Sequence, residues 1–314
     1  MRNTIGLILI TLFFVSDIFA IPVKNKSPLI RKTMTHNGLQ RSYYLYVPSK
    51  INQAKIPLLI ALHGGMGNGE KMEKLTQSGF NTLADEENFI VVYPNGIGRN
   101  WNDGRKSMPS NYKAHNNTID DVGFISALIK KLIETDNVDP ARVYVTGMSN
   151  GAMMTHRLAI ELSDQIAAGA AVCGNIPADL TSTPKSKVSM MMINSMNDPL
   201  VPYEGGYVHF RKKQLGRILS AKESLNFWLE HNGIVVEPTN KEFPSTQPDD
   251  GCRAISVSYL DNDQSTEVVL ISIEGGGHTW PGGWQYFGEK LIGKTCRDFD
   301  ACQMIWDFCK KHSK

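Results

Sequence analysis

Residues 147–151 read Gly-Met-Ser-Asn-Gly, a GxSxG pentapeptide. The pattern lies between an apolar run at 142–147, which predicts a short strand, and a stretch at 150–162 with helical spacing. In a strand–turn–helix context this turn is so tight that the serine backbone is strained, and the two glycines leave room for the neighbouring strand and helix. Ser149 is therefore the candidate nucleophile, and the alternative is a serine that caps the helix.

A serine hydroxyl is a poor nucleophile until a base takes its proton, so a histidine oriented by a carboxylate must accompany Ser149. In α/β-hydrolases the three residues follow the chain order Ser, acid, His. Four histidines lie beyond the helix that follows the serine: His209, His231, His278 and His312. Only His278 stands in a glycine-framed loop, EGGGHTWPGG, directly after a predicted strand. It is the predicted general base.

The acid should lie in a loop that follows a strand between Ser149 and His278. Asp198 meets this requirement, because it follows the apolar run at 188–194 and precedes Pro199, which stiffens the turn. The competing carboxylates lack that combination of a buried strand and a constrained loop: Asp179, Glu204, Asp249, Asp250, Asp261 and Asp263. Asp198 is the predicted acid, and the alternative is an ordinary turn aspartate before proline.

Acyl transfer also needs N–H donors aimed at the developing oxyanion, each worth roughly 3 to 4 kcal/mol. One predicted donor is the backbone N–H of Asn150, the residue after the nucleophile. The other should come from the turn after an early strand, where Gly65 follows the apolar run at 57–62. His63, in the same turn, is expected to support the loop rather than to transfer protons.

Strand and helix signals alternate from about residue 42 onward, which predicts the α/β class, a mostly parallel central sheet with helices on both faces. Predicted strands cover 43–47, 57–62, 89–93, 142–147, 166–172, 188–194, 254–260 and 268–273, and predicted helices cover 70–88, 119–132, 150–162, 221–231 and 298–312. Segment 205–219 is expected to be a solvated loop, with a lid over the site as the alternative. No repeat or linker divides the chain, so we expect a single domain over residues 21–314.

Residues 1–20 have the layout of a secretory signal peptide, with Arg2, an apolar run at 5–15 and a more polar patch that ends in Ala20. The alternative is an uncleaved anchor, because Ile18 is a poor residue three positions before the cleavage point. No other run approaches the roughly 18 apolar residues of a second span. We therefore expect a secreted protein, extracellular or periplasmic, with no membrane contact after signal cleavage.

Composition excludes several other functions. The 33 basic and 31 acidic side chains are spread along 314 residues without a basic stripe, so no nucleic-acid partner is expected. There is no HExxH, no cysteine and histidine cluster at zinc spacing and no P-loop, so we expect neither a metal nor a cofactor. The five cysteines are odd in number, and their spacing fixes no pairing: Cys173, Cys252, Cys296, Cys302 and Cys309.

Six ordered motifs carry a resemblance to a known family. They are LHGG at 62–65, YPNG at 93–96 with a Trp-Asn pair after it, DDVGFI at 120–125, VDPARVYVTGMSNGAMM at 138–154, NDPLVPYEGG at 197–206 and GGGHTWPGG at 275–283. Together they resemble the secreted polyhydroxybutyrate (PHB) depolymerase and feruloyl esterase family of serine esterases, from about residue 40 to the C-terminus. The resemblance implies an α/β-hydrolase fold and the same triad of Ser149, Asp198 and His278.

The resemblance also implies two residues that contact substrate. It places Trp101 and Trp280 near the rim of the expected active site, where an indole could pack on an acyl chain or an aromatic acid; the alternative for each is structural packing.

The resemblance implies a substrate class as well. The expected substrate is an ester, either a hydroxyalkanoate oligomer or polymer or a feruloyl or acetyl ester of plant polysaccharide such as xylan. A serine peptidase and a non-catalytic α/β-hydrolase that only binds are the alternatives, and the second is disfavoured because all three triad candidates are present.

Overall fold

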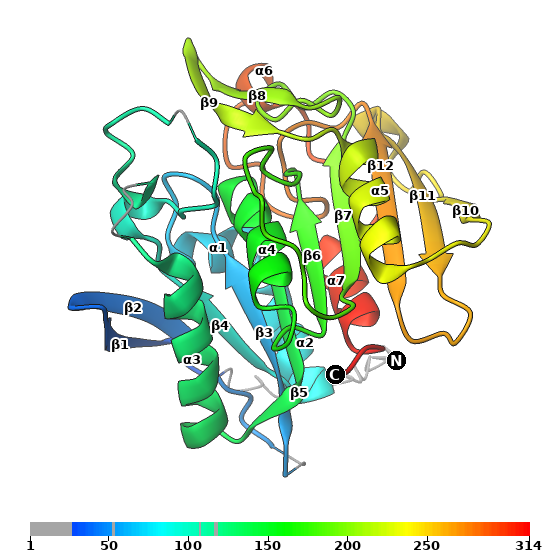
Figure 1. The fold of residues 1–314 in the computed structure, drawn as a ribbon. Coiled ribbons are helices and arrows are strands. Elements are labelled where there is room, and N and C mark those ends of the chain that lie inside the picture. Colours follow the sequence, from blue (N-terminus) through cyan, green and yellow to red (C-terminus); the bar gives the residue numbers. More distant parts are fainter. Residues whose placement is uncertain (1–26, 52–53, 107, 116–118) are drawn as a thin grey trace, which may run out of the picture.

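A computed structural model describes residues 27–51, 54–106, 108–115 and 119–314, so the predicted signal peptide lies outside the described residues. Ten strands form one sheet in the order β1-β2-β4-β3-β5-β6-β7-β12-β11-β10, and β8 and β9 pair separately (Figure 1). The strands are β1 (Ile30–His36), β2 (Leu39–Tyr46), β3 (Ile56–Leu62), β4 (Ile90–Pro94), β5 (Val138–Met148), β6 (Ala168–Val172), β7 (Ser189–Ser195), β8 (Gly206–Phe210), β9 (Lys213–Ile218), β10 (Thr239–Glu242), β11 (Arg253–Leu260) and β12 (Glu267–Glu274). The α-helices are α1 (Gly69–Leu75), α2 (Gly79–Glu87), α3 (Asp121–Thr135), α4 (Asn150–Glu161), α5 (Ala221–Asn232), α6 (Glu289–Ile292) and α7 (Ala301–Cys309).

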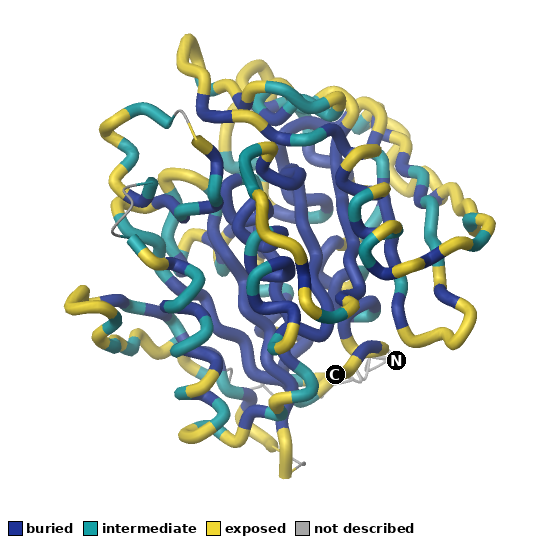
Figure 2. The backbone as a smooth tube through the Cα atoms, in the orientation of Figure 1, coloured by how far each residue is buried: buried dark blue, intermediate teal, exposed yellow. Residues whose placement is uncertain are grey.

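The sheet is parallel at its centre and antiparallel at its edges. Strands β4, β3, β5, β6, β7 and β12 run parallel, while β1, β2, β11 and β10 pair antiparallel. Successive side chains of a strand point to opposite faces. Strand β3 therefore contributes to two apolar clusters, one on each face of the sheet. The cluster with α3, α4 and α5 contains Leu58, Ile60 and Leu62, and the cluster with α1, α2 and α7 contains Leu59 and Ala61. The predicted α/β class with helices on both faces is confirmed, and Figure 2 shows its buried central strands.

The helix predicted at 70–88 is in fact two helices, α1 and α2, and a tertiary contact accounts for the break. The carbonyl oxygen of Leu75 accepts a hydrogen bond from the Trp284 N–H at 3.0 Å, so a distant loop takes an acceptor that would have continued the helix. Gln77 and Ser78 then adopt left-handed backbone conformations, with φ of 52° and 58°. Helical periodicity alone could not reveal this interruption.

Segment 205–219 is a β-hairpin, not the solvated loop that was expected. Strands β8 and β9 pair antiparallel, and Figure 1 shows them beyond the carboxyl ends of β6 and β7. The hairpin packs on Met153 and Val201 through apolar side chains of its own, Val208, Leu215 and Ile218. These contacts hold the hairpin over the end of the sheet where parallel strands place functional loops.

Two edge strands, β1 and β10, have no counterpart in the prediction. No residue of β1 is fully buried, and all four residues of β10 are exposed, so neither has the apolar pattern of a core strand. Among the described residues, no helix has the length and apolar character needed to cross a bilayer.

Candidate active site

Ser149 occupies the turn between β5 and α4 with φ 59° and ψ −120°, a conformation that residues other than glycine rarely adopt. A Cβ on Gly147 would lie 2.5 Å from the carbonyl oxygen of Gly151, and a Cβ on Gly151 would lie 2.4 Å from that of Leu62. Only glycine therefore fits at either position. The Ser149 side chain makes no capping hydrogen bond to α4, which argues against the N-cap interpretation.

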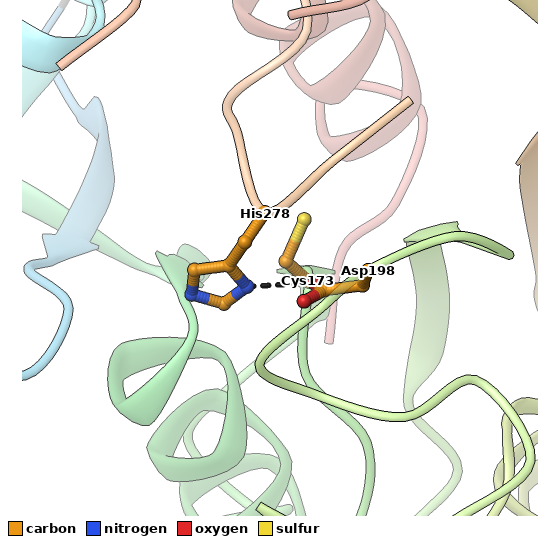
Figure 3. Close-up of side chains that lie close together, drawn as sticks. All are labelled: Cys173, Asp198 and His278. Carbon is orange, nitrogen blue, oxygen red and sulfur yellow. Dashed lines mark hydrogen bonds and ion pairs between the residues drawn. The ribbon is translucent and has the colours of Figure 1, made fainter. Parts of the chain in front are cut away.

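Asp198 and His278 form a buried pair. His278 Nδ1 lies 2.6 Å from Asp198 Oδ2 (Figure 3). The other carboxylate oxygen, Oδ1, accepts the backbone N–H groups of Leu200 at 2.8 Å and Val201 at 2.9 Å. With Nδ1 donating to the carboxylate, Nε2 is the basic nitrogen, and Figure 3 shows it on the opposite side of the ring. This is the orientation that a general base for a serine requires.

The loop that carries His278 is fixed by hydrogen bonds to its backbone. The His278 N–H donates to the carbonyl of Ile292 at 2.5 Å, and the Gly277 N–H donates to that of Lys294 at 2.8 Å. The Tyr286 hydroxyl donates to the His278 carbonyl at 2.9 Å. Burial raises the pKa of Tyr286, so this hydroxyl remains a donor. The backbone thus holds the ring against Asp198.

A pocket of about 670 Å³ brings the predicted residues together. Ser149, His278, Gly65 and Asn150 all line it, whereas Asp198 does not line it and meets the imidazole at Nδ1. Much of the remaining wall is apolar and includes Met153, Leu200, Val201, Val208, Phe210, Leu215 and Ile292. The nucleophile, the base and both proposed oxyanion donors therefore face one cavity.

Gly65 and Asn150 lie side by side. A Cβ on Gly65 would be 4.0 Å from the Cβ of Asn150 and 3.1 Å from Asn100 Oδ1. Asn150 is the first residue of α4, so its N–H has no acceptor within the helix. Its side chain is anchored elsewhere: Oδ1 accepts the Trp101 N–H at 2.7 Å, and Nδ2 donates to Asp103 Oδ2 at 2.6 Å. These contacts leave the backbone N–H as the group available to an oxyanion.

A buried ion pair behind Asn150 was not predicted from the sequence. Arg105 Nη2 lies 2.6 Å from Asp103 Oδ2, and Arg105 Nη1 donates to the carbonyl of Leu215 in β9 at 2.5 Å. Burial disfavours the Asp103 carboxylate, but the charge of Arg105 and its hydrogen bonds outweigh that effect and lower the pKa of Asp103. Asp103 and Arg105 lie in the polar segment 94–117, where no local sequence pattern indicates that a charged side chain is buried.

His63 supports the turn that leads to Gly65, as expected. Its Nε2 accepts the Gly96 N–H at 3.0 Å, and its Nδ1 lies 2.8 Å from the Gly64 carbonyl. Burial lowers the pKa of His63 to about 4, so the ring is neutral with its proton on Nδ1. The indole of Trp101 donates to the His63 carbonyl at 2.9 Å. His63 therefore holds the turn in place through hydrogen bonds to the backbone of Gly64 and Gly96.

Trp101 and Trp280 do not line the pocket, in contrast to their predicted contact with substrate. Both are 0% exposed. Trp101 packs on the ring of His63 with centroids 4.9 Å apart, and Trp280 meets Phe80 edge to face at 5.9 Å. The packing alternative therefore fits both indoles. The aromatic residues that line the pocket are Tyr112, Phe210, Trp284, Tyr286 and Phe287.

Two groups in the described part of the chain bring possible metal ligands within 4.8 Å of one another: Cys173, Asp198 and His278, and Asp250, Cys252 and Cys296. In the first group (Figure 3), the His278 Nδ1 proton is held by Asp198. Burial raises the pKa of Cys173, and its thiol donates to the Thr279 carbonyl at 3.3 Å. These contacts suit a triad rather than a thiolate ligand. All five cysteines are described, and none forms a disulfide.

The sheet, the strained serine turn and the paired histidine define an α/β-hydrolase. Residues 41–209, more than half of the chain, match the family described as esterase PHB depolymerase. The chain belongs to that family and is a carboxylic-ester hydrolase of the serine esterase type.

Two curated relatives and one solved structure illustrate the likeness. NocK of Nocardia uniformis subsp. tsuyamanensis, an esterase by name, is 29% identical over 80% of this chain and 73% of its own length. Feruloyl esterase B of Piromyces equi is 27% identical over 82% of this chain, which spans only 42% of that protein. The acetyl xylan esterase from Aspergillus awamori superposes with a TM-score of 0.55 at 18% identity, covering 80% of this chain and 94% of that one. At that identity the likeness concerns the fold alone.

Proposed function

We propose that this esterase works through an acyl-enzyme formed on Ser149. Ser149 Oγ attacks the ester carbonyl while His278 Nε2 takes its proton, and Asp198 stabilises the imidazolium that forms. The N–H groups of Gly65 and Asn150 hold the oxyanion. The alcohol leaves with the proton from His278, and water activated by the same ring releases the acid. The proposal rests above all on the 2.6 Å bond between Asp198 and His278 beside a pocket that Ser149 also lines.

We propose soluble hydroxyalkanoate esters, such as hydroxybutyrate oligomers, as the substrate class. A largely apolar pocket of about 670 Å³ has the size of a small-molecule site and suits a short, branched acyl chain. A feruloyl or acetyl ester of plant polysaccharide is the second candidate. Relatives named as feruloyl esterase and as bifunctional acetylxylan esterase/xylanase support it.

We further propose that residues 1–20 direct export and are removed, and that residues 21–314 then act as one domain in the extracellular or periplasmic space. The layout of the N-terminal segment supports export. Two apolar clusters that share a single sheet support one domain. The intact mass of the protein recovered outside the cytoplasm tests this. A mass that lacks residues 1–20 is expected, and one that retains them indicates an anchor.

The activity is tested with a panel that holds a short-chain nitrophenyl ester, methyl ferulate, a hydroxybutyrate trimer and a peptide amide. Ser149→Ala is assayed alongside, with Ser245→Ala as the matched control because Ser245 is exposed and does not line the pocket. We expect Ser149→Ala to lose activity on every ester and Ser245→Ala to keep it. Fastest cleavage of the trimer supports the hydroxyalkanoate role, and fastest cleavage of methyl ferulate supports the feruloyl role.

Two outcomes contradict the proposal. If Ser149→Ala retains the activity of the parent, the nucleophile is wrong. If only the peptide amide is cleaved, the protein is a peptidase and the substrate class is wrong.

A further inference from the structure

The pocket shared by Ser149 and His278 has an unbalanced charge. Its described lining includes four side chains that are cationic at neutral pH and no aspartate or glutamate: the cations are Lys71, Lys74, Arg99 and Arg105. The chain as a whole is close to balance, with 33 basic and 31 acidic side chains. The excess positive charge is therefore a property of the pocket.

Two of the four cations already have acidic partners. Arg105 is buried against Asp103 at 2.6 Å, and Lys74 lies 3.0 Å from Glu70. Lys71 and Arg99 differ, because no carboxylate of the described residues lies within 4.0 Å of either charge. Both residues are exposed. Their charges remain available to a ligand in the pocket.

Arg99 is fixed beside the turn after β3 that contains Gly65. Its guanidinium donates to the carbonyl of Met66, the residue after Gly65. Its backbone is left-handed, with φ of 66°, and so is that of Met66, with φ of 61°. Lys71 lies in the first turn of α1, which begins two residues after Gly67. The two charges therefore belong to the wall that also carries the Gly65 donor.

The hairpin supplies a wall of different character. It contributes Val208, Phe210 and Leu215, which are apolar, and Leu200 adds to them. A substrate with an apolar body and one anionic end is complementary to both walls. A hydroxyalkanoate oligomer with a free carboxyl end has this form, since its chain is aliphatic and its terminal acid is ionised at neutral pH.

We propose that the enzyme prefers esters that carry a free carboxylate, specifically soluble hydroxyalkanoate oligomers with an ionised end, and that Lys71 and Arg99 bind that carboxylate. This inference rests on the proposed esterase function and specifies its substrate. Each exposed pair strengthens binding by about two- to fivefold, so the two together account for a preference of about tenfold. Neither residue takes part in bond cleavage.

The test compares two dimers of 3-hydroxybutyrate that contain the same internal ester. One ends in a free carboxylate and the other in an N-methylamide, which is neutral and is not an ester. Chromatography of the remaining dimer gives kcat/KM for each, because one cleavage releases two molecules of 3-hydroxybutyrate from the acid but only one from the amide. We expect the wild-type enzyme to favour the acid, and sodium chloride raised from about 20 mM to about 0.5 M to reduce that preference by screening the charges.

The variant Lys71→Ala/Arg99→Ala should lower the acid-to-amide ratio of kcat/KM by about tenfold. Lys71→Arg/Arg99→Lys keeps both charges and should keep most of the preference. Lys222→Ala is the matched control, because Lys222 is exposed on α5 and does not line the pocket. Its ratio should equal that of the wild type.

Several results would overturn the inference. A wild-type ratio near one, a ratio insensitive to salt and to the double variant, or an equal loss on both dimers excludes recognition of the carboxylate. Cleavage of the nitrophenyl ester but of neither dimer excludes this substrate class while leaving the esterase function intact. An enzyme inactive on the nitrophenyl ester as well removes the proposed function itself.

Discussion

The side chain of Asn150 donates from Nδ2 to Oδ2 of Asp103 at 2.6 Å, and Asn150 directly follows the proposed nucleophile. Asp103 is completely buried, and its charge is balanced by Arg105. A buried carboxylate thus fixes the residue whose backbone N–H is proposed to hold the oxyanion. Preorganised donors of this kind stabilise charge in the transition state without reorganising during the reaction.

Replacing Asp103→Asn should reduce both activity and stability. The change removes the negative charge and leaves Arg105 buried without a counter-ion, so the free energy of unfolding should fall by about 3 kcal/mol. We also expect kcat on a neutral nitrophenyl ester to fall at least about tenfold, because Asn150 loses a charged acceptor. Urea unfolding and steady-state kinetics measure the two effects. Asp164→Asn, at an exposed site, serves as the control, and an unchanged kcat in Asp103→Asn would contradict the positioning role.

Replacing Asp198→Asn should reduce kcat by about 10³- to 10⁴-fold with little change in KM. The amide does not attract the Nδ1 proton of His278 as a carboxylate does, so the imidazole loses the tautomer and orientation that a base requires. Steady-state kinetics on a short-chain nitrophenyl ester check this. Asp249→Asn, at an exposed position, should behave like the parent. A loss below about tenfold in Asp198→Asn would point to another acid.

Gly151→Ala should destabilise the protein by about 3 kcal/mol, because its Cβ would lie 2.4 Å from the carbonyl oxygen of Leu62. Gly288→Ala is the matched control, since an added Cβ there meets no atom within 4 Å. We expect that control to change the unfolding free energy by less than about 0.5 kcal/mol. Urea denaturation of the two variants measures the unfolding free energy of each. Equal stability would mean that the turn relaxes around the new methyl group.

Trp280 and Trp284 should respond differently to truncation. Trp280 is 0% exposed in the core, so Trp280→Ala should cost about 3 to 5 kcal/mol of unfolding free energy. Trp284 is 56% exposed and lines the pocket, so Trp284→Ala should leave stability nearly unchanged and raise KM for aromatic esters. Thermal unfolding and kinetics on methyl ferulate test both. If Trp280→Ala instead raised KM without loss of stability, Trp280 would be a substrate-binding residue.

Stability should fall as the pH drops below about 6.5. Burial lowers the pKa of His63 to about 4, of His156 to about 3 and of His312 to about 4. Between those values and the unfolded pKa of about 6.5, the unfolded chain binds more protons than the folded one, so acid favours unfolding. Each group contributes a slope of up to about 1.4 kcal/mol per pH unit near pH 5.

The histidine contribution is measured by urea unfolding at pH 7.5, 6 and 5. His63→Gln should reduce the slope by the share of one group, whereas Ser245→Ala, which changes no titratable group and is at an exposed position, should leave it unchanged. A slope that His63→Gln does not alter would show that His63 is not neutral in the folded protein.

The proposed triad could be chosen from the sequence because its signals are local. Ser149 and Asp198 each follow a buried strand, and His278 lies in a glycine-framed loop, so type, spacing and chain order select three residues of which Asp198 and His278 pair and Ser149 and His278 line one pocket. Trp101 and Trp280 were placed near the site by the family resemblance alone, and neither lines the pocket, because contacts with distant partners bury both side chains. Trp284, four residues beyond Trp280, carried no distinguishing pattern.

Most of the fold was predictable for a similar reason. Parallel central strands are buried on both faces and therefore appear as continuous apolar runs such as 57–62 and 188–194. The hairpin of β8 and β9 has no such run, because its tip is basic and its stability comes from Met153 and Val201. The partnership of Asp103 with Arg105 was equally hidden, since charged residues in a polar segment ordinarily face water.

Arg105 makes two contacts. It donates to the Leu215 carbonyl in the β8–β9 hairpin and to the carboxylate of Asp103, the residue that fixes the side chain of Asn150. The outer end of the hairpin, with Arg211 and Lys212, lies beyond that attachment and is exposed. Mutations at the outer end can therefore accumulate, or be introduced by directed evolution, without shifting the residues proposed to perform hydrolysis. A hairpin held through Leu215 and exposed at its end lets the outer surface of one esterase diverge while the support of its serine turn is kept.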